Sequence, residues 1–259
     1  MRLLLTICLL LAMLLAVPSW AQIAFDAATE DDAITDTASC SWIHTPVGTP
    51  KGILVCLQEA NGAGDVISAV TYGGVSMTRV AYVKNDEAGE DGAVWAYFLG
   101  SSIPTGPQTV ACTVDSGTSV KHGVAVSVTA GADTQLAGMG DGTGYCTVNS
   151  ESVDDPSCTI SSISAASYAF GCMWHEDGGP ANITAGTGFT MRHQDDFGAQ
   201  VSSVESRTSE LASGDEVIAF NTNITLGGED DVAMIGTAIE EVGGAPTYNP
   251  AAQQTIVIQ

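Results

Sequence analysis

The sequence predicts an all-β fold, a two-sheet antiparallel β-sandwich of jelly-roll-like type, and three observations favour it. Short runs rich in β-branched and aromatic residues recur along the chain, at 53–57, 94–98, 109–114 and 124–128. Turn-forming dipeptides separate these runs, among them Asn61-Gly62, Gly73-Gly74 and Asp91-Gly92. With 29 glycines and 6% aromatic residues, the composition suits tight turns better than long helices.

Composition and charge exclude two broad classes of protein. The chain is 45% hydrophobic, so it has enough apolar surface to offset the entropy of folding and is not a disordered chain. It carries 30 Asp and Glu against 7 Lys and Arg, a net charge of −23. Because nucleic acids are bound largely through Lys and Arg, we expect no nucleic-acid partner.

The first 21 residues have the pattern of a secretory signal peptide. Arg2 precedes the apolar run 3–17, and the small residue Ala21 offers a cleavage site. A membrane anchor is the alternative, but the run is shorter than the ~20 residues that span a bilayer. We therefore expect a protein that is secreted, extracellular or at a cell surface, with no membrane insertion after signal removal.

Six cysteines remain after the signal segment: Cys40, Cys56, Cys112, Cys146, Cys158 and Cys172. None forms a Cys-x-x-Cys pair, so disulfides are favoured over zinc ligation in an exported chain. Opposed positions of antiparallel hairpins lie within disulfide reach, which predicts Cys40–Cys56 and Cys158–Cys172. Elimination then leaves Cys112–Cys146. The main alternative joins Cys56 to Cys172, which are equivalent positions of the repeat described next.

Two halves of the chain, about 37–131 and 155–242, share four features in the same order. Each begins with a cysteine pair followed by a glycine, Gly62 or Gly178, and the motif Gly74-x-x-Met77-x-Arg79 returns as Gly188-x-x-Met191-Arg192. The dipeptides 110–111 and 124–125 are matched by 218–219 and 232–233. The sequence therefore predicts a signal peptide (1–21), a domain at 22–242 formed from two pseudo-repeats that fold together into one sandwich, and a linker with a C-terminal β-prone tail at 243–259.

Histidines and carboxylates gather in one region of the second repeat and form a weak candidate metal site. The residues are His175, Glu176, Asp177, His193, Asp195 and Asp196. Imidazole and carboxylate groups together bind divalent cations, but adjacent strand residues point to opposite faces. A solvated acidic loop is therefore the favoured interpretation. Acidic loops elsewhere admit weak calcium binding, and no other cofactor is expected.

Motifs for common catalytic chemistries are missing from the sequence, including the Gly-x-Ser-x-Gly elbow and the His-Glu-x-x-His helix. We therefore expect no catalytic residues. Tyr72, Trp95 and Tyr97 form a candidate glycan-contact surface, because aromatic residues on a strand can stack on sugars. Core packing is the competing interpretation and the more frequent fate of such residues.

The end of the chain is the most suggestive segment for assembly. A linker rich in Gly and Pro at 243–250 precedes Thr255-Ile256-Val257-Ile258, which is uncharged and strongly β-forming. This tail is a candidate assembly strand that adds to a neighbouring subunit; the alternatives are pairing with its own sheet edge or simple disorder. Self-association or a surface partner is therefore among the expected interactions.

The run Val70-Thr71-Tyr72-Gly73-Gly74-Val75-Ser76-Met77-Thr78, with 94–99 and Pro104-Thr105-Gly106, resembles a known module. It is a β-sandwich module that recurs in secreted and surface proteins of bacteria and in phage structural proteins. The resemblance extends from about Phe25 to Val242. It implies a fold and an exported location, but no catalytic residues, and the many cysteines and strong acidity depart from the usual pattern.

These observations lead to one principal expectation about function. We expect a non-catalytic, secreted structural or adhesive β-sandwich protein, a subunit of an extracellular fibre or surface assembly. The alternatives are a carbohydrate-binding module assisted by calcium and, third, a glycoside hydrolase, for which the many carboxylates offer pairs of unknown separation.

Overall fold

The computed structural model is all-β, as the sequence predicts, and contains no helix in the part of the chain that it describes. Its strands are antiparallel throughout. The described residues are 22–31, 39–60, 64–85, 92–115, 122–137, 144–150, 155–163, 167–176, 183–196, 200–211, 214–222 and 231–242. The expected signal segment and the C-terminal tail, Thr255 to Ile258 included, lie outside these residues.

Two sheets are formed by the first half of the chain. Sheet A has the order β1-β9-β3-β7-β6, with β1 (Ala24–Asp31), β3 (Gly52–Ala60), β6 (Thr78–Asn85), β7 (Gly92–Leu99) and β9 (His122–Thr129). Sheet B has the order β2-β8-β4-β5, with β2 (Ser39–His44), β4 (Ile67–Tyr72), β5 (Val75–Ser76) and β8 (Gln108–Val114).

The second half forms two further sheets. Sheet C has the order β10-β18-β13-β16-β15, and β11 also pairs with β18; its strands are β10 (Thr134–Leu136), β11 (Tyr145–Ser150), β13 (Tyr168–Glu176), β15 (Phe189–Asp196), β16 (Gln200–Arg207) and β18 (Val232–Glu241). Sheet D has the order β12-β17-β14, with β12 (Ser157–Ile163), β14 (Ile183–Ala185) and β17 (Gly214–Thr222).

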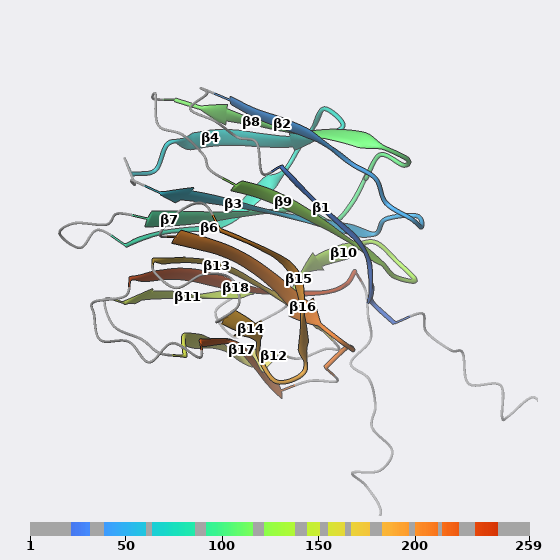
Figure 1. The fold of residues 1–259 in the computed structure, drawn as a ribbon. Coiled ribbons are helices and arrows are strands. Elements are labelled where there is room, and N and C mark those ends of the chain that lie inside the picture. The colour runs from blue at the N-terminus through green and yellow to red at the C-terminus, as the bar shows by residue number, and fades with distance from the viewer. Residues whose placement is uncertain are drawn as a thin grey trace, which may run out of the picture.

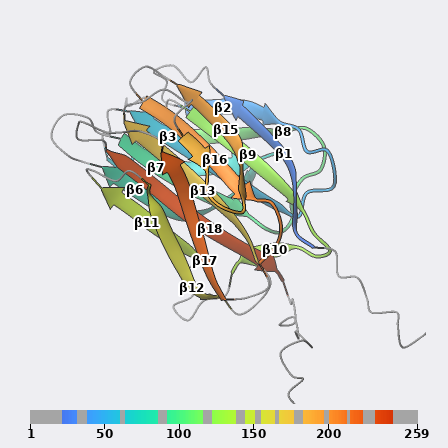
Figure 2. The same cartoon turned by 60° about the horizontal axis from the view of Figure 1, so that its bottom comes forward.

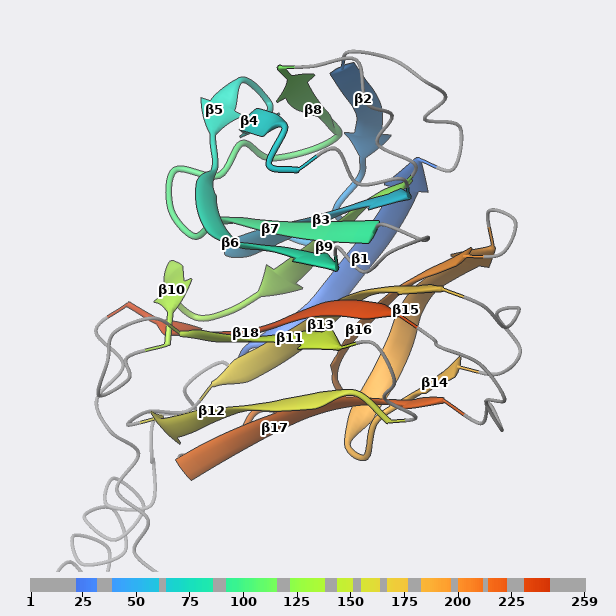
Figure 3. The same ribbon diagram turned by 90° about the vertical axis from the view of Figure 1, so that its left-hand side faces the viewer.

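The sheets stack face to face in the order B, A, C, D, so the molecule has four layers where one pair of sheets was expected (Figures 1 and 3). A separate apolar core fills each of the three interfaces. Tyr72 and Trp95 pack in the core between B and A, Phe170 and Trp174 between A and C, and Met173 between C and D. Figure 2 shows strands of sheets A and C running along a common diagonal, the aligned mode of sheet packing.

The two inner sheets are covered on both faces, and their sequences reflect it. Every residue of β7 is buried, and so is β18 except for its last residue. Strands covered on both sides lose the alternation of apolar and polar residues and become continuous apolar runs. The interpretation of 232–239 as a central, doubly covered strand is thereby confirmed.

Apart from β5 and β10, the described strands of the two halves follow the same topology. The order β1-β9-β3-β7-β6 of sheet A corresponds to β11-β18-β13-β16-β15 of sheet C, and β2-β8-β4 of sheet B corresponds to β12-β17-β14 of sheet D. The matched cysteines and apolar dipeptides fall on corresponding strands, whereas Gly62 and Gly178 lie outside the described residues. Their residue register is not uniform, however, because Cys56 pairs with Val124 whereas Cys172 pairs with Ile235 rather than Val232.

This arrangement also corrects the expected packing of the halves. Each half makes its own pair of sheets, and the two pairs meet through sheets A and C, rather than contributing strands to one common sandwich. Close approach at this contact requires a residue without a side chain at Gly92, where an added Cβ would lie 2.1 Å from the indole of Trp174.

The cysteines pair differently from the three predicted bonds. The structure forms Cys40–Cys112, Cys56–Cys172 and Cys146–Cys158, with Cα–Cα distances of 5.0, 6.1 and 5.8 Å. The predicted Cys40–Cys56, Cys158–Cys172 and Cys112–Cys146 are therefore wrong, and the alternative between equivalent positions, Cys56–Cys172, is the one found. Three disulfides indicate an oxidising compartment.

The error has a simple physical cause in the β2–β3 connection. Residues 45–50 do not close a hairpin within one sheet; they cross from sheet B to sheet A. Cys40 therefore finds its partner directly opposite in its own sheet, on β8. Cys56 lies in the core shared with sheet C and reaches Cys172 across the interface. The same crossing separates Cys158 on β12 from Cys172 on β13.

A membrane-spanning helix, long and apolar enough for a bilayer, is not found among the described residues.

Removing the bond between the halves should destabilise the protein most. Loop-closure entropy grows with the length of the closed loop, and Cys56–Cys172 spans 116 residues against 12 for Cys146–Cys158. We expect Cys56→Ala with Cys172→Ala to lower the free energy of unfolding by about 4–5 kcal/mol, against about 3 kcal/mol for the Cys146→Ala, Cys158→Ala control. Denaturant unfolding of both variants measures this, and equal losses would contradict it.

Candidate functional site

The described polar groups with the most suggestive geometry form a relay between sheets A and C. The imidazole of His193 on β15 contacts the Glu30 carboxylate of β1 through Nδ1. Its Nε2 lies 3.2 Å from the Ser202 hydroxyl of β16. A second imidazole, His122 on β9, has its ring centroid 5.9 Å from that of His193, and its Nε2 lies 3.4 Å from the Asp195 carboxylate. Four strands of two sheets thus converge here.

The order carboxylate, imidazole, hydroxyl is the arrangement that activates a serine nucleophile. Burial argues against that chemistry here, because Ser202 has 0% exposure and faces the inside of the A–C interface. A substrate carbonyl would need to reach the hydroxyl oxygen, and the packed sheets leave it no approach. What the contacts do is fix the orientation of both rings and join β1 and β9 of the first half to β15 and β16 of the second.

The candidate metal residues are divided between two faces of sheet C. His193 and Asp195 point toward sheet A, where they meet His122 and Glu30. His175 follows Trp174, which lies in the A–C core, so strand alternation directs it toward sheet D. Glu176 ends β13, Asp196 ends β15, and Asp177 lies outside the described residues. In the described parts of the chain, no group of three or more His, Cys, Asp or Glu side chains is arranged to hold a metal ion.

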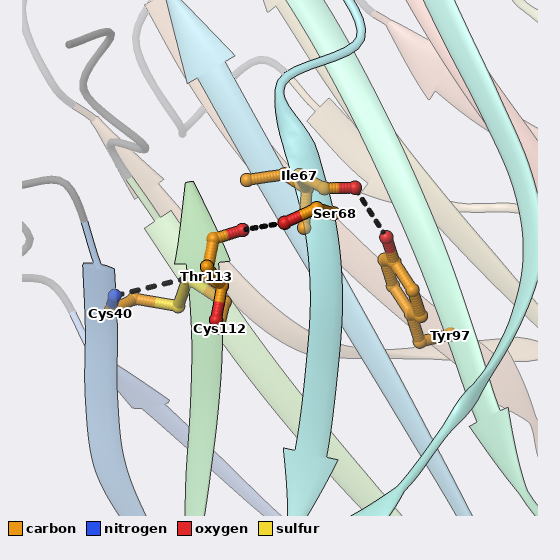
Figure 4. The surroundings of a disulfide bond; sticks show 6 residues. All are labelled: Cys40, Ile67, Ser68, Tyr97, Cys112 and Thr113. Atoms are coloured by element: carbon orange, nitrogen blue, oxygen red, sulfur yellow. Dashed lines mark hydrogen bonds between the residues drawn. A yellow bond between two sulfur atoms is a disulfide. The ribbon is translucent and has the colours of Figure 1, made fainter. Parts of the chain in front are cut away.

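The candidate glycan-contact residues are core residues, which corrects that prediction. Tyr72, Trp95 and Tyr97 have exposures of 0%, 0% and 2% in the core between sheets A and B. The polar atoms of two of them are used internally: the Trp95 indole donates to Asp65 at 3.1 Å, and the Tyr97 hydroxyl donates to the Ile67 carbonyl at 2.9 Å (Figure 4). Aromatic rings held in this way offer no flat platform to a sugar.

Two buried carboxyl groups lie between sheets C and D, and no sequence pattern predicted either of them. Glu205 on β16 accepts a hydrogen bond from the Gly186 amide at 2.9 Å, but burial raises its pKa to about 8. Glu216 on β17 lies 3.1 Å from the Arg207 guanidinium, which lowers its pKa, while the larger effect of burial raises that pKa to about 7. Both groups therefore hold a proton at mildly acidic pH.

One buried histidine has a lowered pKa, in contrast to the raised pKa values of the two carboxyl groups. His44 packs on β2 as its alternation with Cys40 and Trp42 predicts, and its Nδ1 lies 2.7 Å from the Thr29 hydroxyl. Burial lowers its pKa to about 4, although the nearby Asp26 carboxylate acts to raise it. The ring is therefore neutral at physiological pH.

Three members of the relay were not candidates from the sequence: Glu30, His122 and Ser202. Glu30 belongs to an acidic run that looks solvated, and His122 follows Lys121 in what looks like a loop. The structure places His122 at the first position of the apolar strand β9, with 2% exposure. The usable signal was the apolar run 124–128 directly after it, which extends the strand back to the histidine.

The sequence matches no known family model and no curated protein.

Stability should decrease as the pH rises through the titration range of Glu205. Its pKa in the folded state, about 8, lies above its ordinary value of 4.5. Between these two pH values the folded protein therefore keeps a proton that the unfolded chain has released. The stabilisation that this proton provides is complete below about pH 4.5 and is lost by about pH 8.

The variant Glu205→Gln keeps a neutral side chain at every pH and isolates this effect. We expect its stability relative to the parent protein to improve between pH 5 and pH 8, with a slope of up to ~1.4 kcal/mol per pH unit. Denaturant unfolding at several pH values measures this. Asp115→Asn, which removes an exposed carboxylate, is the control. A parallel pH dependence of the parent and Glu205→Gln proteins would refute the assignment.

Proposed function

We propose that this chain is an exported, non-catalytic structural or adhesive module that acts as a subunit of an extracellular or surface assembly. One observation carries the proposal: covalent bonds reinforce successive levels of the stack. Cys40–Cys112 joins neighbouring strands of sheet B, Cys56–Cys172 joins sheet A to C, and Cys146–Cys158 joins β11 of sheet C to β12 of sheet D. Disulfides of this kind form and persist in oxidising environments outside the cell, where they stabilise the folded state.

The placement of the polar chemistry supports the same proposal. The residue types that would serve a binding or catalytic site are used inside the molecule, as Trp95 and Tyr97 are in the B–A core and His193 is between sheets A and C. A carbohydrate-binding role loses the aromatic contacts that motivated it. The disulfides agree with an extracellular location, which the signal-like segment at 1–21 also favours.

A hydrolase is the second candidate, because the Glu30–His193–Ser202 relay has the connectivity of a serine nucleophile. Burial of the hydroxyl weighs against it. We expect a fluorophosphonate probe, which modifies activated serines, to leave the native protein unlabelled. Ser202→Ala is the control variant. Labelling of the parent protein that disappears in Ser202→Ala would establish a reactive serine and overturn the non-catalytic proposal.

Assembly of the exported chain tests the proposal directly. The protein is expressed with its own N-terminal segment, and the fraction outside the cell is measured by light scattering over a range of concentrations. We expect particles larger than the 26.5 kDa chain. A matched chain lacking residues 250–259 tests the tail: smaller particles would support strand donation by Thr255 to Ile258. A protein that stays inside the cell, or remains monomeric at every concentration, would contradict the proposed role.

A further inference from the structure

One amide side chain in the A–C interface is buried without hydrogen bonds. Gln58 on β3 follows Cys56 of the A–C core and Leu57 of the B–A core, so strand alternation directs it toward sheet C. It has 0% exposure, and within the described chain neither its Nε2 nor its Oε1 has a hydrogen-bond partner. A buried amide in this state is costly, because it has given up its hydrogen bonds to water and gained none in return.

The strand register places this amide beside the relay of Glu30, His193 and Ser202. On the neighbouring strand β9, His122 lies directly opposite Gln58. The ring centroid of His122 is 5.9 Å from that of His193, whose Nε2 contacts the Ser202 hydroxyl. In addition, β3 contacts β16, the strand that carries Ser202, across the interface.

The disulfide between the halves leads to the same placement. The amide lies two residues beyond Cys56 on β3, and Trp174 lies two residues beyond Cys172 on β13. The two strands run in the same direction, because Gly92, which is paired with the end of β3, contacts the Trp174 ring. Ser202 is paired with Trp174 in sheet C. The buried amide and the buried hydroxyl therefore come from facing strands of the two halves.

We propose that Ser202 and Gln58 form an intramolecular ester that joins sheet C to sheet A. The Ser202 Oγ attacks the carboxamide carbon Cδ of Gln58, and His193, oriented by Glu30, takes the hydroxyl proton. The proton passes to the amide nitrogen, the C–N bond breaks, and one molecule of ammonia leaves as the C–O bond forms. No oxidant, metal or water is consumed. The reaction occurs once in each chain and goes beyond the proposed structural role without depending on it.

Burial, which keeps an outside substrate away from Ser202, favours this internal reaction. The two groups are held near one another by the fold and need not meet by diffusion. The Trp174 indole N–H, which has no hydrogen-bond partner among the described residues, is the donor available to the negative oxygen that develops during the attack. Exclusion of water then protects the ester from hydrolysis. The product also removes the unpaired N–H groups of the buried amide.

Peptide mass spectrometry of the protein expressed from the full chain tests the proposal. After reduction and alkylation, trypsin releases Gln58 in the peptide 52–79 and Ser202 in the peptide 193–207. We expect these two peptides to be joined in the parent protein, with their summed mass lowered by one ammonia. Hydroxylamine, which cleaves esters and leaves amides intact, should separate them. The joined pair is the necessary readout, because cyclisation of an N-terminal glutamine also releases ammonia.

Three variants assign the bond to its two residues. Ser202→Ala removes the nucleophile and Gln58→Met removes the carboxamide at similar size, so both should release the two peptides only separately. Ser203→Ala is the matched control: its hydroxyl is equally buried on β16 but faces sheet D, as Val201 does, and the joined pair should remain. Circular dichroism verifies that each variant is folded. A parent digest with only separate peptides, or a joined pair in Ser202→Ala, would overturn the ester and leave the proposed structural role standing.

The stability of the disulfide variants offers a second readout. An ester between Gln58 and Ser202 continues to hold the halves together when Cys56–Cys172 is removed. The loss of unfolding free energy caused by Cys56→Ala with Cys172→Ala should therefore be larger in the Ser202→Ala background than in the parent protein. Equal losses in the two backgrounds would count against the ester.

Discussion

Burial of both faces of sheets A and C is the constraint on which the rest of the structure depends. It explains why β7 and β18 are apolar along their length and why the halves cannot separate without exposing a complete core. It also explains where small residues occur: Gly92 meets the Trp174 ring, and Gly171 faces Gly236 across neighbouring strands of sheet C. Larger side chains there would hold the layers apart.

The same constraint also requires hydrogen-bond partners for the polar side chains that are buried in the inner layers. A polar group taken from water needs a partner, since an unmade hydrogen bond in the interior costs about 1–3 kcal/mol. The relay of His193, Glu30 and Ser202 meets this need at the A–C interface, and the Gly186 amide meets part of it for Glu205 between C and D. These contacts join β1 of sheet A to β15 and β16 of sheet C, and β16 to the segment at Gly186.

The sequence was sufficient for the fold class but not for the number of layers. Short β-rich runs and turn dipeptides are local signals, and they predict strands correctly at 53–57 and 124–128. Whether consecutive strands pair with each other is a non-local property. The segment at 45–50 has the composition of a hairpin turn, yet it carries the chain from one sheet to another. The disulfide assignments failed for this reason alone. The glycan-contact prediction was wrong for a related reason, because the direction in which the Trp95 ring points depends on which layers cover its strand.

The bond between Cys56 and Cys172 has a consequence for how the chain matures. Cys40 and Cys112 belong to the first half and meet in one sheet, so they become neighbours as soon as that half is complete. Cys56 cannot form its native disulfide until Cys172, which lies 116 residues later in the chain, has been synthesised. During that interval it can react with the wrong cysteine of its own half. Correct maturation therefore depends on the order of oxidation, and on the ability of the oxidising compartment to reverse a premature bond.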